Sequence, residues 1–305
     1  MPTHDSPTNR WPDRPTLSAA FYKGHGLGND YLVFENGEDW PATEKNVQTV
    51  CDRHRGVGSD GIVVLLPGNH LRMFNPDGGE FERSGNGLRI LGSYLWRRSM
   101  HVESYDVRVG GDEVHLIIHG RDGPRYDVSA EMGRATAGGE AVALDPGLFE
   151  IDGTVRGPDG SVLSVVPVSV GNPHLVVVTD GSAATFSEER LADVGPFLVS
   201  HPALHHGANV QLVRVTAPDR CDALIWERGV GRTSTSGTSA CAVAVALVSS
   251  GRLAPGVITV TMPGGSFTVG VTRDLDVVLR GPVEEIFEGR LSSELARALR
   301  GDPES

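Results

Sequence analysis

Two short segments share one pattern, in which a serine is followed by glycine and then by two small or polar residues. The first is Ser84-Gly85-Asn86-Gly87, and the second, 152 residues later, is Ser236-Gly237-Thr238-Ser239. An apolar stretch with helical spacing follows each one. A helix that begins at such a turn presents unpaired backbone amides and the positive end of its dipole, which together bind carboxylates and other anions. If the two turns face one ligand, the two serines approach a single carbon from opposite sides.

Further polar residues stand beside turn-forming residues and could complete a binding site. They are Asn29, the stretch Asn75-Pro76-Asp77-Gly78, the triplet Asn172-Pro173-His174, Asn209 and the pair Glu227-Arg228. Taken singly, each has a structural explanation, because Asn beside Gly or Pro is usually a turn residue and a Glu-Arg pair usually forms a surface ion pair. Arranged around the serine turns, they would supply amide groups and one fixed cation, which can hold a zwitterionic amino acid.

Residues 56–61, Gly-Val-Gly-Ser-Asp-Gly, match the glycine pattern of dinucleotide-binding loops. Such a loop follows a strand and opens a helix, whereas this segment precedes the β-type run of residues 62–66. The context therefore argues against a nicotinamide or flavin site.

Composition and charge narrow the range of partners. The formal net charge is −12 and the pI about 5.3, and the chain has no run of Lys or Arg. Nonspecific nucleic-acid binding needs clustered basic residues, so we expect no nucleic-acid partner. The apolar runs are too short to span a bilayer and the N-terminus is polar, so we expect no membrane partner and a cytoplasmic location.

Cysteine and histidine give no sign of a disulfide framework or a metal site. Cys51, Cys221 and Cys241 are odd in number and scattered, which favours reduced thiols. His201 and the pair His205-His206 have no Cys or carboxylate nearby at a recognised ligand spacing, so no metal is expected.

The length of 305 residues favours two domains. Helical spacing predicts helices at residues 43–53, 87–97, 187–194, 239–249 and 291–299. Short β-branched runs predict strands at residues 31–34, 62–66, 107–109, 114–118, 163–168, 175–178, 210–215, 258–262 and 277–279. The helix at 239–249 carries small and aliphatic residues on most faces, so we expect it to be buried.

A second repeat indicates two related halves, since Gly-Asn-Asp-Tyr-Leu-Val at residues 28–33 echoes Gly-Asn-Pro-His-Leu-Val at residues 171–176. The predicted fold class is α+β, with two pseudo-symmetric domains that are each a curled, mostly antiparallel sheet around a central helix. We expect a disordered leader at residues 1–17, because this segment is polar and rich in Pro. The expected domains are residues 18–133 with about 282–290, residues 134–281 after a crossover near 132–139, and a C-terminal helix and tail at 291–305.

Seven motifs occur in order between about residues 19 and 290. They are Lys23-Gly24-His25-Gly26-Leu27-Gly28-Asn29-Asp30, Gly56-Val57-Gly58-Ser59-Asp60-Gly61, Asn75-Pro76-Asp77-Gly78, Ser84-Gly85-Asn86-Gly87-Leu88-Arg89, Gly171-Asn172-Pro173-His174, Glu227-Arg228-Gly229-Val230-Gly231 and Pro263-Gly264-Gly265. With them the sequence resembles diaminopimelate epimerase, a cofactor-independent isomerase of the same superfamily as proline racemase. The resemblance implies an isomerase of amino-acid metabolism and lysine biosynthesis, with an amino acid or related carboxylate as substrate and no cofactor. It leaves a homodimer open.

The resemblance also implies a role for each matching position. The residues that would grip the reacting α-carboxylate are Gly85, Asn86, Gly87, Gly237 and Thr238. Asn75 and Glu227 would hold the α-ammonium, and His174 and Glu227 would sit against the catalytic pair. The residues that would bind the distal amino and carboxylate end are Asn29, Asn172, Asn209 and Arg228.

The chain departs from the family motif at the catalytic pair itself. The motif has cysteine at both turn positions, where one thiolate removes the α-proton and the opposite thiol delivers a proton to the other face, but here these positions are Ser84 and Ser236. A thiol can be tuned to thiolate near neutral pH, whereas a serine hydroxyl needs an adjacent base. Cys241 lies more than one helical turn past Ser236 and cannot readily substitute. A second departure is Arg232, where the family pattern has glutamate, and the charge reversal could remodel that loop.

Three hypotheses remain open. The protein is a divergent isomerase in which His174 or Glu227 is the base and the serines donate hydrogen bonds, and its chemistry could then be a proton shift, an elimination or a cyclisation in secondary metabolism. Alternatively, it is a diaminopimelate epimerase whose cysteines were replaced for structural work. In the third hypothesis it is a noncatalytic carboxylate-binding protein that kept the pocket.

Overall fold

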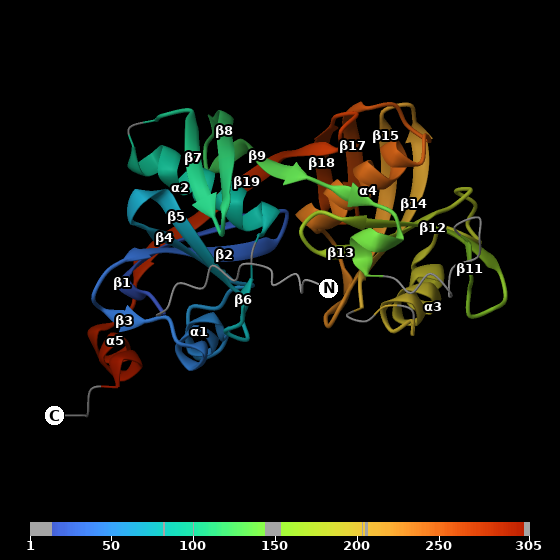
Figure 1. Ribbon diagram of the computed structural model, residues 1–305. Coiled ribbons are helices and arrows are strands. Elements are labelled where there is room, and N and C mark those ends of the chain that lie inside the picture. Colours follow the sequence, from blue (N-terminus) through green and yellow to red (C-terminus); the bar gives the residue numbers. More distant parts are fainter. Residues whose placement is uncertain are drawn as a thin grey trace, which may run out of the picture. The chain divides into compact units, whose positions relative to one another are not determined.

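The computed structural model describes residues 14–81, 83–99, 101–143, 154–202, 204 and 207–301. The chain divides into two compact units, shown in Figure 1: unit 1 is Met1–Gly26, Asp30–Tyr126 and Val283–Ser305, and unit 2 is Leu27–Asn29 and Asp127–Pro282. The α+β fold with two sheet domains agrees with the prediction. Residues 1–13 of the expected leader and 302–305 of the expected tail lie outside the described residues, while Thr16 and Leu17, expected in the leader, open the first strand.

Unit 1 is a mixed sheet with helices in its connections. Its elements are β1 (Thr16–Gly26), β2 (Asn29–Asn36), β3 (Trp40–Pro41), α1 (Glu44–Cys51), β4 (Ile62–Leu66), η1 (Pro67–Asn69), β5 (His70–Phe74), β6 (Glu80–Phe81), α2 (Gly85–Arg98), β7 (Ser104–Val109), β8 (Asp112–Asp122), the start of β9 (Arg125–Arg134), the end of β19 (Asp276–Arg290) and α5 (Ser293–Arg300). β2 is parallel to β4, β4 is antiparallel to β5, β5 is parallel to β7, and β7 is antiparallel to β8. Parallel neighbours need a crossover, and α1 and α2 lie in these two crossovers.

Unit 2 repeats this pattern. Its elements are the rest of β9, β10 (Thr136–Ala137), η2 (Gly139–Val142), β11 (Thr154–Arg156), β12 (Val162–Ser169), β13 (Pro173–Val178), α3 (Glu188–Val199), β14 (Asn209–Ala217), β15 (Arg220–Glu227), β16 (Gly231–Thr233), α4 (Gly237–Ser249), β17 (Gly256–Met262), β18 (Gly265–Val271) and the start of β19. β13 is parallel to β14, β14 is antiparallel to β15, β15 is parallel to β17, and β17 is antiparallel to β18. The order of pairings matches that of unit 1, so the two halves share one topology.

Each unit is organised around one helix, which is α2 in unit 1 and α4 in unit 2. In α4, every residue from Ala240 to Leu247 is fully buried, which confirms the expectation for this helix. The helix packs against β12, β13, β14, β17 and β18 of its own unit. α2 packs in the same manner against β1, β4 and β8. The turn before each helix is therefore held at the edge of a rigid core.

The glycine-rich segment of residues 56–61 connects α1 to β4, which is the reverse of a dinucleotide-binding loop. The Lys23 ammonium donates to the Gly58 carbonyl at 2.6 Å and pairs with Asp30 at 2.9 Å. Arg53 pairs with both Asp30 and Asp60. Burial acts to raise the pKa of Asp30, but Arg53 and Lys23 together hold it below its usual value. The motif is thus a structural turn fixed by partly buried ion pairs.

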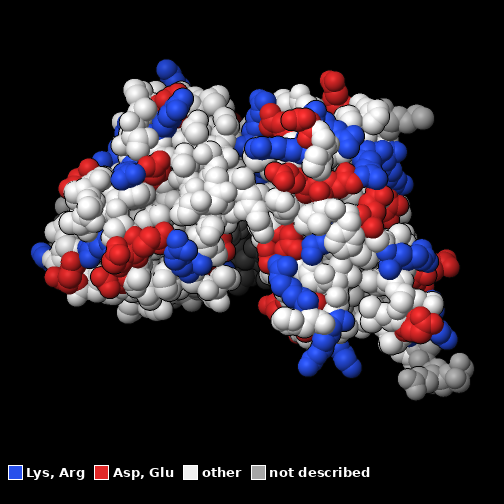
Figure 2. Space-filling model, turned by 180° about the vertical axis from the view of Figure 1, so that it is seen from behind, with Lys and Arg blue, Asp and Glu red and all other residues white. Residues whose placement is uncertain are grey.

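The surface carries charges of both signs. Figure 2 shows Lys and Arg side chains lying among Asp and Glu on this face of the molecule. Pairs of this kind include Arg98 with Glu35 at 2.6 Å in unit 1 and Arg280 with Asp127 at 2.5 Å in unit 2. Within the described part of the chain, each helix is too short or too polar to cross a membrane.

Candidate active site

In unit 1 the first serine turn is an N-cap. Ser84 precedes α2 in extended conformation, and its Oγ accepts a hydrogen bond from the Gly87 amide at 3.1 Å. This is the ordinary geometry of a serine cap. The first turn is buried, and a Cβ at Gly26 would lie 2.8 Å from Asn86 Oδ1, so only glycine fits against it.

A buried arginine stands behind the same turn. Arg89 has no exposed surface, its Nε donates to the Gly85 carbonyl at 3.2 Å, and its guanidinium also donates to Asn86 Oδ1. A positive charge held against the first turn adds to the positive end of the helix dipole. The α2 turn therefore favours an anion electrostatically. The residue at the corresponding place of α4 is Cys241, which is also fully buried.

Asn75 lies in the exposed turn between β5 and β6. Its backbone closes the turn, because the Asn75 amide donates to the Gly79 carbonyl and the Gly78 amide donates to the Asn75 carbonyl, both at 2.9 Å. Gln48 of α1 anchors the turn by donating to the Asp77 carbonyl at 2.6 Å. Asn75 and Glu227 are 152 residues apart, the separation that also relates Ser84 to Ser236. Asn75 directly follows β5 and Glu227 is the last residue of β15, so the two residues occupy corresponding places in the two units.

In unit 2 the second serine turn has the same form. Ser236 Oγ accepts from the Ser239 amide at 3.4 Å and lies 3.4 Å from Thr238 Oγ1. Thr235 donates to the Leu27 carbonyl at 3.0 Å, which holds the segment Leu27–Asn29 against the start of α4. Asn29 therefore follows a turn that is anchored beside Ser236.

The remaining predicted residues of unit 2 meet at one edge of its sheet. The parallel register places His174 beside Asn209, and the antiparallel register places Trp226 beside Val210, so Glu227 and Arg228 follow at the same edge. The Arg228 amide donates to Asn209 Oδ1 at 2.9 Å.

His174 is joined to a residue that the sequence did not single out. Its Nε2 lies 2.9 Å from Asn172 Oδ1, and its Nδ1 lies 3.0 Å from Gln211 Nε2, which in turn donates to Ser239 Oγ at 3.0 Å. Burial, together with the nearby Arg228 cation, lowers the pKa of His174 to about 3, although the hydrogen bond with Gln211 acts in the opposite direction. The imidazole is therefore neutral at ordinary pH. A glutamine inside the otherwise apolar run of β14 was the signal that could have pointed to Gln211.

Arg232 has an acidic partner on a neighbouring helix. It forms a bidentate ion pair with Glu188 in the first turn of α3, with Nη2 2.6 Å from Oε1. Arg232 holds the pKa of Glu188 below its usual value. The ion pair between Arg232 and Glu188 thus ties β16 to α3.

The described residues contain no group of three His, Cys, Asp or Glu side chains that could hold a metal ion. His201 packs against the Phe197 ring, while His205 and His206 lie outside the described residues.

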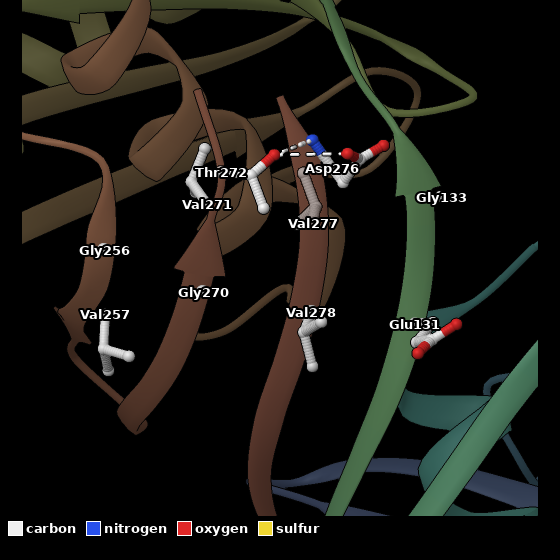
Figure 3. A pocket seen from close by; sticks show the side chains of 10 residues that line it. All are labelled: Glu131, Gly133, Gly256, Val257, Gly270, Val271, Thr272, Asp276, Val277 and Val278. Carbon is white, nitrogen blue, oxygen red and sulfur yellow. Dashed lines mark hydrogen bonds between the residues drawn. The ribbon is translucent and has the colours of Figure 1, made fainter. Parts of the chain in front are cut away.

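A pocket of about 470 Å³ opens on unit 2 beside β9, β17, β18 and β19. Figure 3 shows its valine and glycine lining, with Glu131 and the Thr272–Asp276 pair at its edges. The candidate residues do not line it.

Comparison with known proteins decides the family. The profile of the diaminopimelate epimerase family matches residues 21–137 and 166–286. The chain belongs to the diaminopimelate epimerase family. Among its relatives, the diaminopimelate epimerase of Desulforudis audaxviator is 36% identical over 291 residues, which is 88% of this chain and 98% of that protein. The diaminopimelate epimerase of Synechococcus elongatus is 35% identical, over 92% of this chain and all of that protein.

Solved structures agree on the fold. A hydroxyproline epimerase from Agrobacterium vitis superposes with a TM-score of 0.64 at 15% identity, covering 92% of each chain. A phenazine biosynthesis protein from Bacillus anthracis superposes with a TM-score of 0.61 at 13% identity, covering 90% of this chain and 98% of that one. The protein is thus a member of a family of amino-acid epimerases with this two-domain fold.

Proposed function

We propose that the protein is a cofactor-independent isomerase that acts at the α-carbon of an amino acid with a distal carboxylate, using one carboxylate base instead of two thiols. Diaminopimelate, for which its relatives are named, is the first substrate to test. The observation that carries the proposal is the pair of serine-capped helix starts, one in each unit. They keep the family's anion-binding turns and lack its acid–base atoms.

Each predicted residue has a place in this proposal. The first-turn groups that hold the α-carboxylate are Gly85, Asn86, Gly87, Gly237 and Thr238, with Ser84 and Ser236 as hydroxyl donors. Asn75 contacts the α-ammonium. The residues for the distal end are Asn29, Asn172, Asn209 and Arg228. A helix N-terminus with polar first-turn groups suits a carboxylate, and the Arg228 guanidinium suits a second one.

Glu227 is the base in this proposal. Ser84 and Ser236 lack a base within their caps, and a hydroxyl is not a base by itself. His174 is neutral, and both of its ring nitrogens already have hydrogen-bond partners. Glu227, half-buried at the end of β15, would take the α-proton and return it to the substrate, at the same carbon or at a neighbouring one.

The test is isotope exchange. The protein is incubated with L,L-diaminopimelate in deuterated water, and incorporation of deuterium at the α-carbons is followed by NMR. We expect slow exchange that falls at least about 100-fold in Glu227→Gln, which is the usual weight of a general base. Glu188→Gln, which removes a surface carboxylate of the same unit, is the matched control and should exchange like the wild type. Exchange that survives Glu227→Gln would contradict the assigned base.

Two other functions are outcomes of related measurements. Calorimetric binding of diaminopimelate without any exchange or product would identify a noncatalytic carboxylate-binding protein, which the absence of thiols at positions 84 and 236 favours. Cysteine codons at both positions of the natural gene would identify a diaminopimelate epimerase with replaced residues.

A further inference from the structure

A buried chain of four polar side chains runs through unit 2. It links Asn172, His174, Gln211 and Ser239 by contacts of 2.9, 3.0 and 3.0 Å, and the last three of these residues have no exposed surface. Ser239 also donates its amide to Ser236 Oγ. This series of hydrogen bonds thus connects the second serine turn with Asn172, which directly precedes β13.

The fold does not require this series of hydrogen bonds, because unit 1 has the same topology without it. The repeat of residues 28–33 and 171–176 relates His174 to Tyr31, and the matching parallel registers relate Gln211 to Val63. The offset of the serine turns relates Ser239 to Gly87, where a Cβ would lie 3.0 Å from Val63 Cγ2. An apolar contact in unit 1 thus stands where unit 2 has a buried hydrogen bond.

The number of available partners fixes the direction of each hydrogen bond. Gln211 Nε2 reaches both His174 Nδ1 and Ser239 Oγ, and Gln211 Oε1 has no partner among the described residues. Reversing the amide would leave two buried N–H groups unpaired instead of one oxygen, which costs more. His174 Nδ1 therefore accepts, and the neutral ring carries its proton on Nε2.

The Nε2 proton determines how Asn172 is oriented. His174 Nε2 donates to Asn172 Oδ1, so the Asn172 amide NH2 remains as the group available to a ligand. The side-chain amide of Asn209 has the same orientation, since its Oδ1 accepts a hydrogen bond from the Arg228 backbone amide and its NH2 is left as the donor. The side chains of both asparagines consequently offer N–H donors.

We propose that Gln211 and Ser239 are positioning residues that hold His174 in its Nε2–H form and thereby make Asn172 a donor for a ligand carboxylate and not for an ammonium. The proposal rests on the proposed function in one respect, which is that Asn172 contacts the substrate.

The first test determines which nitrogen of the His174 imidazole carries the proton. In full-length protein labelled with ¹⁵N-histidine, and with His174 assigned from the spectrum of His174→Gln, we expect Nδ1 to be unprotonated and Nε2 protonated at neutral pH. Gln211→Glu places a carboxylate at Nδ1 and should protonate that nitrogen. A protonated Nδ1 in the wild type, or no change in Gln211→Glu, overturns the proposal whether or not the protein is active.

The second test measures how well the protein distinguishes diaminopimelate from lysine. Lysine differs from diaminopimelate by lacking the distal carboxylate, so the ratio of the two dissociation constants measures recognition of that group. In Gln211→Met, which keeps the volume and removes the amide, we expect diaminopimelate to bind about tenfold more weakly and lysine to be little affected. An unchanged ratio overturns the role given to Asn172.

Tyr22→Phe is the matched control, because it also removes a buried hydrogen bond, from the Tyr22 hydroxyl to Ser93 Oγ at 2.9 Å in unit 1. It should change stability but neither the His174 spectrum nor the ratio. If the wild type binds neither amino acid, the proposed function fails while the histidine spectrum still decides the positioning role.

Discussion

Ser84 and Ser236 are the N-caps of α2 and α4. Each Oγ accepts an amide of its own helix, at 3.1 Å from Gly87 and 3.4 Å from Ser239. Such a cap leaves the hydroxyl proton able to donate to a bound carboxylate. In the proposed site, the two hydroxyls would therefore bind a carboxylate without removing the α-proton.

Placing a thiol at each of the two turns should introduce two-base chemistry. In Ser84→Cys/Ser236→Cys we expect α-deuteration of L,L-diaminopimelate to rise at least about 100-fold above the wild type, because acid–base groups would then be present at both turns. Each single variant should gain much less, since removal and delivery of the proton need both groups. A double variant that exchanges no faster than the wild type would show that more than the two sulfur atoms separates this protein from its relatives.

The five α-helices in the described part of the chain were readable from the sequence, whereas several strands, among them β1, β9, β15 and β18, and the long-range contacts were not. The helices at α2 and α4 begin two residues before the predicted starts, because glycines that usually end helices here form the first turn. α3 continues to Val199, past the predicted end at Val194, and tolerates Pro196 within its last turns. Gln211 was missed because its partners lie 37 and 28 residues away along the chain, and only the sheet register brings them together.

The caps of α2 and α3 offer a matched comparison between elements. Ser84→Ala and Ser187→Ala each remove a side-chain cap, and each should lower the free energy of unfolding by about 1 kcal/mol. Only Ser84→Ala should also weaken binding of diaminopimelate, since only the α2 turn belongs to the proposed site. Denaturant titration and calorimetry measure the two effects. Equal loss of binding in both variants would mean that the cap acts through stability alone.

For the whole molecule, the buried neutral histidine predicts loss of stability in acid. Below its ordinary pKa of 6.5, a histidine of the unfolded chain binds a proton that His174 does not bind until about pH 3. The unfolded state then holds more protons, so stability falls as the pH falls. Between pH 7 and pH 4 we expect the free energy of unfolding to decrease by about 3 kcal/mol more in the wild type than in His174→Gln. Denaturant titrations at the two pH values measure it, and parallel profiles would contradict a buried neutral imidazole.

The shared topology of the two units allows their interiors to differ. A chain built from two copies of one fold holds two versions of every inward position, and the strand pairings that define the fold do not depend on which side chains fill them. The corresponding positions of the two units hold different buried residues, namely Tyr31 and His174, Val63 and Gln211, and Arg89 and Cys241. One unit can therefore bury a polar group at a position where the other buries a different side chain, and a substitution in one interior need not be matched in the other.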